Sequence, residues 1–102
     1  MTTDKYIETL KIKLNTGSTG EHSYRGPLEA LIQGIVADVK VINEPKRQAC
    51  GAPDYIILRN VIEVGYIETK DIGDADLEGK KKNKEQFDRY KKGLPNIIFT
   101  DY

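Results

Sequence analysis

Two apolar, β-prone segments in the middle of the sequence constrain the fold more than any other feature. Residues 55–58 and 61–67 are rich in Ile, Val and Tyr, and the pair Arg59-Asn60 between them is typical of a turn. The pattern predicts a β-hairpin. If that hairpin is centred on residue 61, Asp54 lies opposite Glu68, because the two positions are equally distant from the centre.

The expected hairpin brings two carboxylates and a lysine together. Side chains alternate along a strand, so Glu68 and Lys70 face one side and Asp54 joins them. Opposed carboxylates repel each other, and a divalent cation removes that repulsion. The carbonyl of Thr69 adds a candidate metal ligand, and Lys70 suits orientation of a water or stabilisation of negative charge. The spacing fits equally a surface hairpin in which Lys70 balances an acid in a salt bridge.

The rest of the chain alternates helical and extended patterns. Pro27 should kink or restart the second helix, while Gly93 and Pro95 should end the third. A crossover helix before the last strand predicts an α/β fold with a mixed sheet. We expect helices over residues 3–14, 20–36 and 77–92, and strands over 39–43, 54–58, 62–70 and 96–100.

Composition narrows the class of protein. A chain of 102 residues supports one small domain, and its single cysteine, Cys50, excludes a disulfide framework. No signal peptide or long apolar run is present, so we expect a cytoplasmic protein. The chain stops soon after its last apolar strand, from which we expect residues 1–102 to be one module of a larger enzyme.

The charge distribution is uneven although the net charge is zero. Clustered basic residues either bind a phosphate backbone or form a solvated helix face. The candidates for DNA binding are Lys80, Lys81, Lys82, Lys84 and Arg89.

Three further residues are candidates for the site. Glu21 is either a third carboxylate near the hairpin or part of a capping box beginning at Ser18. Gln86 and Tyr90 are four residues apart and share one helix face, where they either line a site or serve ordinary packing and exposure.

Several motifs in this order resemble one family. Pro53-Asp54 and Glu68-Thr69-Lys70 resemble the PD-(D/E)XK nuclease superfamily, and Gln86-x-x-x-Tyr90 resembles the QxxxY motif of its Mrr-like branch. More narrowly, the chain is similar to the N-terminal nuclease domain of single-chain Type ISP restriction-modification enzymes. The blocks that carry this resemblance are GEHSYRGPLEALI, INEPKRQACGAPDYI, GYIETKDIG, QFDRY and LPNIIFTDY. In those enzymes a helicase-like ATPase and an adenine methyltransferase follow the nuclease.

The resemblance implies a fold and an activity. The fold is a restriction-endonuclease-like αβββαβ core, with a mixed four-stranded sheet flanked by helices and an extra N-terminal helix. The activity is Mg²⁺-dependent cleavage of double-stranded DNA, with Mn²⁺ as a substitute. By resemblance, Asp54, Glu68 and Glu21 bind metal, Lys70 is catalytic, and Gln86 and Tyr90 line the active site.

Two other functions stay open at this point. One is a catalytically inactive DNA-binding or interaction module with the same fold, and the other is a structure-specific resolvase or repair nuclease. Gly20, Gly26 and Thr69 depart from the usual pattern of the family, which puts the local helix geometry in doubt.

Overall fold

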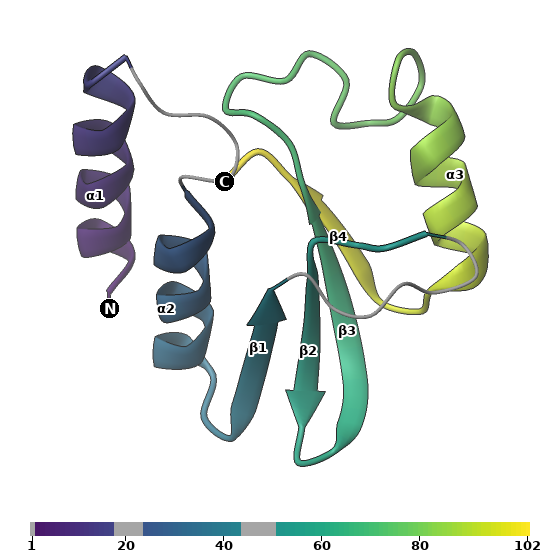
Figure 1. Ribbon diagram of the computed structural model, residues 1–102, viewed down its shortest axis with the longest axis horizontal. Helices are drawn as coiled ribbons and strands as arrows, with labels where there is room; N and C mark the ends of the chain where they lie inside the picture. The colour runs from purple at the N-terminus through teal and green to yellow at the C-terminus, as the bar shows by residue number, and fades with distance from the viewer. Residues whose placement is uncertain (1, 18–23, 44–50) are drawn as a thin grey trace.

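The computed structural model describes residues 2–17, 24–43 and 51–102 and places a β-sheet between helices (Figure 1). The sheet order is β1-β2-β3-β4. The pairs β1–β2 and β2–β3 are antiparallel, and β4 lies parallel to β3. The elements are α1 (Thr3–Asn15), α2 (Arg25–Ile35), β1 (Val39–Asn43), β2 (Tyr55–Arg59), β3 (Ile62–Thr69), α3 (Lys84–Gly93) and β4 (Ile97–Thr100).

This arrangement confirms the expected α/β fold. Two consecutive parallel strands can be joined only by a crossover connection, and helix α3 forms this crossover between β3 and β4. The sheet is mixed, four-stranded and flanked by helices, with α1 as the additional N-terminal helix (Figure 1). It is compatible with a restriction-endonuclease-like αβββαβ core.

Both faces of the sheet are covered, and each cover has its own apolar cluster. On one face Tyr6 of α1 and Leu28 of α2 pack with Tyr55 and Ile67. On the other face Tyr90 of α3 packs with Ile56 of β2 and Tyr66 of β3, each of which is next in sequence to a residue of the first cluster. Adjacent residues of β2 and β3 are therefore buried on alternate faces, which explains why both segments are almost wholly apolar.

The hairpin turn differs from the expected one. Arg59 pairs with Ile62, so the turn is Asn60-Val61, and Val61 is 90% exposed rather than part of a strand. Val64 is an additional residue on β3, because Ile57 pairs with Gly65 while Leu58 pairs with Glu63. This β-bulge shifts the register by one residue. Without it, Asp54 would lie opposite Ile67 instead of Glu68.

Helix α2 begins at Arg25, so Pro27 lies in its first turn. The first N–H groups of a helix have no intrahelical partner, and proline is tolerated there. Of the two expected outcomes for Pro27, the helix start applies within the described residues. Residues 20–23 of the expected helix, Glu21 among them, lie outside those residues.

Helix α3 begins at Lys84, seven residues later than the expected start at Leu77. The preceding segment is a loop in which the carboxylate of Asp76 accepts backbone N–H bonds from Lys80, Lys81 and Asn83. Side-chain acceptors of this kind compete with helix formation.

The end of α3 also differs from the expected one. Gly93 is the last helical residue, and the C-cap is Leu94, with extended backbone. The N–H of Leu94 still bonds to the carbonyl of Tyr90, so the last turn is closed without a left-handed glycine.

The last strand, β4, is less buried than its composition suggests, and Ile98 is 57% exposed.

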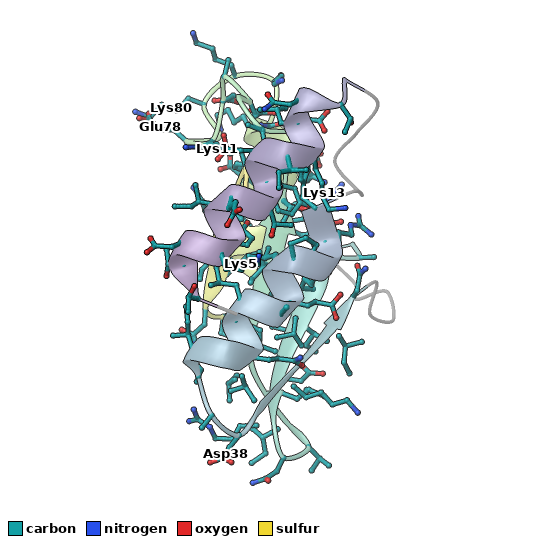
Figure 2. All side chains as sticks on the ribbon, turned by 90° about the vertical axis from the view of Figure 1, so that its left-hand side faces the viewer. Lys5, Lys11, Lys13, Asp38, Glu78 and Lys80 are labelled. Atoms are coloured by element: carbon teal, nitrogen blue, oxygen red, sulfur yellow. The ribbon has the colours of Figure 1, made fainter. Side chains whose placement is uncertain are left out.

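Figure 2 views the molecule from the side of α1, with Asp38 at one end and the loop that carries Glu78 and Lys80 at the other. Within the described ranges, no helix is long and apolar enough to cross a membrane.

Candidate functional site

Three polar side chains meet where β3 emerges from the sheet. Glu68 and Lys70 face α3, as strand alternation predicts, and Lys70 Nζ lies 3.7 Å from Glu68 Oε2. Gln86 of α3 completes the group: its Oε1 accepts a hydrogen bond from Lys70 Nζ at 2.6 Å, and its Nε2 donates to Glu68 Oε2 at 3.3 Å. The Lys70 ammonium also lies 5.8 Å from the centre of the Phe87 ring. We call Glu68, Lys70 and Gln86 the polar cluster.

The charged pair of the polar cluster is largely shielded from solvent, which argues against a plain surface salt bridge. The side chains of Glu68 and Lys70 are only 6% and 19% exposed. A charged pair of this kind is expensive to desolvate unless further hydrogen bonds satisfy it. Gln86 supplies those bonds, so of its two expected placements it takes the one beside the charged groups rather than the exposed one.

Asp54 reaches the same end of the sheet but makes different contacts. Its backbone N–H donates to Glu68 Oε1 at 3.2 Å, as the opposed positions predict. Its carboxylate instead bonds to Thr69, with Oδ2 accepting from the Thr69 N–H at 2.8 Å and the Thr69 hydroxyl at 2.7 Å. The expectation that Asp54 joins Glu68 and Lys70 on one face therefore holds for its backbone N–H but not for the contacts of its carboxylate. Asp54 precedes β2, so strict alternation does not govern its side chain.

Arg25 is a member of the site that sequence reasoning missed. It is 6% exposed, and its guanidinium donates to Asp54 Oδ1 at 2.7 Å and to Asn43 Oδ1 at 3.2 Å. The sequence holds one signal for this burial. Arg25 stands three residues before Leu28 and so shares the inward face of α2.

Tyr90 lies under the segment that leads into β2. A side chain at Gly51 would come within 2.8 Å of the Tyr90 ring, so the backbone of Gly51 rests directly on that ring. Burial raises the pKa of the Tyr90 hydroxyl, and the nearby charge of Glu68 raises it further. Tyr90 is 3% exposed and belongs to the apolar cluster, so its position fits both packing and a place beside the polar cluster.

A set of tyrosines reaches Thr69, which bonds to the Asp54 carboxylate. The Tyr102 hydroxyl donates to Thr69 Oγ1 at 3.0 Å, and the Tyr6 hydroxyl donates to the Tyr102 carbonyl at 3.0 Å. The rings of Tyr24 and Tyr102 lie 5.3 Å apart. These contacts connect Asp54, through Thr69, to α1 and α2.

The donor set suits a hard divalent cation. Mg²⁺ prefers oxygen ligands and is commonly bound through one or two carboxylates, with water completing its shell. Asp54 and Glu68 supply two carboxylates at one end of the sheet. No group of three or more Asp, Glu, His or Cys side chains gathers as a metal site in the described part of the chain. The expected third carboxylate, Glu21, lies outside that part, and the Thr69 carbonyl stays a predicted ligand.

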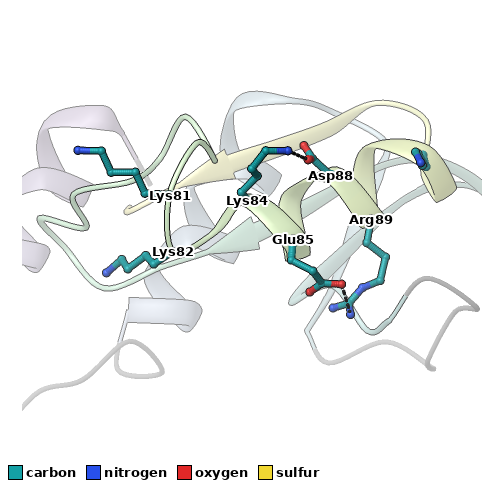
Figure 3. Close-up of a pocket in the computed structure, with 7 residues that line it drawn as sticks. Lys81, Lys82, Lys84, Glu85, Asp88 and Arg89 are labelled. Carbon is teal, nitrogen blue, oxygen red and sulfur yellow. Dashed lines mark hydrogen bonds and ion pairs between the residues drawn. The ribbon is translucent and has the colours of Figure 1, made fainter.

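The expected DNA-binding residues divide into two groups. Lys80 pairs with Glu78 at 2.9 Å and stands apart from the others. The remaining four line an open depression of about 640 Å³ beside α3 (Figure 3). Ion pairs Lys84–Asp88 and Glu85–Arg89 cross it along the helix. The lining residues are Lys81, Lys82, Lys84, Glu85, Asp88, Arg89 and Lys92.

Buried acceptors fix the loop that presents these lysines. Burial acts to raise the pKa of the Asp76 carboxyl, but the N–H donors of Asn83, Lys80 and Lys81 outweigh it and lower that pKa below its usual value. Asp74 Oδ1 accepts from the Asp76 N–H and from Asn83 Nδ2. Charge-assisted bonds of this kind hold the loop backbone in one conformation.

Comparison with known proteins shows a similarity to a solved structure. Neither a protein-family model nor a curated protein matches the chain. Among solved structures, it is similar to a chain in the cryo-EM structure of a DrdV–DNA complex, with 26% sequence identity and a TM-score of 0.70. The alignment covers 95% of this chain and 71% of that chain. The likeness therefore concerns the whole arrangement of helices and sheet.

Proposed function

We propose that this chain is a Mg²⁺-dependent endonuclease domain that hydrolyses phosphodiester bonds in double-stranded DNA, with Mn²⁺ as a substitute metal. The observation that carries the proposal is the partly buried polar cluster, which joins a carboxylate and a lysine beside the second carboxylate of Asp54. The similarity to a chain of a DrdV–DNA complex supports DNA as the partner.

Asp54 and Glu68 are the residues that we expect to hold the metal, with the Thr69 carbonyl and Glu21 as further ligands. When bound, Mg²⁺ would neutralise charge on the phosphoryl oxygens and favour ionisation of an attacking water. The chain's own contribution is orientation. Asp54 is held by Thr69 and Arg25, and Glu68 is held by Gln86 and by the backbone of Asp54.

Lys70 is the residue that we propose to act on the scissile phosphate. Gln86 accepts one of the three ammonium N–H groups of Lys70, and the Phe87 ring lies near the same nitrogen. A lysine fixed in this way and screened from bulk water stabilises developing negative charge more strongly than a mobile surface lysine. Tyr90 would line the same site from α3.

The depression beside α3 is the surface that we propose for the DNA backbone. Five of its seven lining side chains are basic and two are acidic. Neutralising phosphates with lysine and arginine releases counterions, which gives affinity without sequence readout. Gln86 of the polar cluster also belongs to α3, so the same helix links the basic surface to the site.

We also propose that residues 1–102 serve as the cleavage module of a restriction-modification enzyme. The resemblance in sequence motifs supports a parent polypeptide with a helicase-like ATPase and a methyltransferase. In such an enzyme, the choice of target would belong to other domains.

Plasmid nicking tests the proposal. Supercoiled DNA is incubated with Mg²⁺ or Mn²⁺ and with the wild-type chain, Lys70→Ala or Asp54→Ala. We expect each substitution to lower the nicking rate by about 100-fold or more, because each removes a preorganised charge from the site. Glu8→Ala, an exposed change on α1, serves as the control that retains wild-type nicking. Equal nicking by all four chains would sink the catalytic assignment.

One observation favours the alternative of an inactive DNA-binding module. The carboxylate of Asp54 already accepts bonds from Arg25 and Thr69, so its charge is balanced within the protein itself. Following the hairpin amides by NMR during a Mg²⁺ or Mn²⁺ titration separates the two functions. A response confined to the amides around Asp54 and Glu68 favours the nuclease, whereas DNA binding without any metal response favours the module. A resolvase or repair nuclease would share this site and differ only in preferring branched or damaged DNA.

A further inference from the structure

The ion pair between Arg25 and Asp54 is the least exposed of the ion pairs between described residues. The side chains of Arg25 and Asp54 are 7% and 13% exposed, and the nitrogen–oxygen distance is 2.7 Å. Asn43 at the end of β1 accepts a second guanidinium bond. Arg25 therefore ties the start of α2 to both β1 and the entry to β2.

Asp54 is held on both of its carboxylate oxygens. Oδ2 accepts two bonds, from the Thr69 N–H and hydroxyl, and Oδ1 accepts one bond, from Arg25. An ionised carboxylate offers about four acceptor sites, so these contacts leave about one, which is on Oδ1. Rotation of the carboxylate is blocked because it would break the bond at either end.

We infer that Arg25 is a positioning residue for metal binding, which holds Asp54 so that its remaining Oδ1 acceptor site is available to a divalent cation. This inference rests on the proposed function. Arg25 itself does not touch the cation or the DNA, and it acts only through Asp54. Thr69, which is fixed in turn by the Tyr102 hydroxyl, holds the opposite oxygen.

The direction in which cation affinity changes when Arg25 is replaced distinguishes positioning from simple electrostatics. Arg25 carries a positive charge next to a proposed metal ligand. If that charge acted only by repulsion, its removal would strengthen the binding of a cation. If Arg25 positions Asp54, its removal weakens binding in spite of the lost repulsion. Loss of a residue that orients a metal ligand typically lowers metal affinity by about 10–100-fold.

The test compares Arg25→Gln with Arg59→Gln, which removes one exposed positive charge at the far end of β2. Two quantities are measured for each chain: the dissociation constant for Mn²⁺ alone, by calorimetry, and hydrogen exchange of the Thr69 amide without metal. For Arg25→Gln we expect Mn²⁺ binding to weaken by about 10–100-fold and Thr69 exchange to accelerate by about tenfold, because Asp54 no longer holds that N–H. Arg59→Gln should match the wild type in both.

Arg25→Lys keeps the test informative if Arg25→Gln does not fold. Lysine retains the charge but lacks the planar fork of arginine, so we expect the same two changes at smaller size. Unchanged or tighter Mn²⁺ binding in a folded Arg25 variant overturns the inference. If the wild-type chain binds no Mn²⁺, the proposed function fails instead. Thr69 exchange then decides the role of Arg25 alone: acceleration supports its hold on Asp54, and no change refutes it.

Discussion

Gln86 is the residue that holds the polar cluster together. Lys70 and Glu68 are 3.7 Å apart, which is longer than a hydrogen bond, and Gln86 bonds to both of them. Its amide is suited to this task because it offers an acceptor to the ammonium and a donor to the carboxylate. The distance between the two charged groups is therefore set by a neutral side chain of another element.

Gln86→Ala should lower the nicking rate strongly and change the Tm little. The substitution removes both bonds but leaves a good helix former on α3, so we expect the rate to fall by about 10–100-fold. Rates are measured on supercoiled plasmid, and Tm is measured by circular dichroism. Gln86→Glu tests the same point from the other direction, because a carboxylate there would repel Glu68. A rate within twofold of wild type in both variants would exclude a role for Gln86.

At the scale of elements, the loop before α3 packs closely against the helix where the backbone of Gly79 meets the Phe87 ring. Gly79 has a φ of 70°, and a Cβ on it would come within 2.6 Å of the Phe87 ring. Phe87 in turn stacks on Phe99 of β4, with ring centres 3.8 Å apart. The loop, α3 and β4 are thus joined through one aromatic pair.

Gly79→Ala should destabilise the protein more than Gly17→Ala. Both glycines have a positive φ near 70°, but a Cβ on Gly17 meets no atom within 4 Å. We expect Gly17→Ala to cost about 1–2 kcal/mol from backbone strain alone. Gly79→Ala should cost a further 1–3 kcal/mol, approximately, from overpacking against Phe87. The free energies of unfolding come from urea titration, and equal losses would show that Phe87 gives way without cost.

At the scale of the whole molecule, tyrosines bind the N-terminal helices to the end of the chain. Tyr6 of α1 reaches the backbone of Tyr102, and Tyr102 reaches Thr69 of β3. Burial is the main cause that raises the pKa of Tyr6 from 10.0 to about 12, and the charges of Tyr102 and Asp101 add to it. The pKa values of Tyr55 and Tyr102 are raised as well, in each case mainly by burial.

These raised pKa values predict a loss of stability at alkaline pH. The folded protein holds the Tyr6 proton more tightly than the unfolded chain, so this contribution is complete below pH 10 and is lost as the pH rises through about 12. We expect Tyr6 to account for about 2 kcal/mol of that loss.

Thermal unfolding between pH 8 and pH 11.5 measures the loss. Tyr6→Phe should start from a lower Tm, because it lacks the bond to Tyr102, and should then decline less steeply. Parallel declines in the two proteins would contradict the raised pKa.

How much of the site was predictable depends on whether a residue lies inside a regular element. Glu68 lies in β3 and Lys70 directly follows that strand, so the period-two pattern placed these two side chains correctly. For Gln86 the helical spacing left a site-lining and an exposed position open, and only its contacts with Lys70 and Glu68 decided between them. The predicted start of α3 was wrong because Asp76, whose carboxylate accepts the backbone N–H bonds that replace the helix there, resembles any other surface acid in sequence. The catalytic and metal-binding roles of these residues stay predictions.

The sequence by itself determined the order of the elements, the mixed sheet and the meeting of Glu68 with Lys70. These features follow from local patterns of apolar residues, which act over one strand or a few helical turns. Only the tertiary structure decided that a bulge at Val64 aligns Asp54 with Glu68, and that Arg25 holds the carboxylate of Asp54. Both depend on contacts between segments far apart in the chain. A charge can be buried only where folding brings a compensating partner close to it, and local sequence patterns do not identify that partner.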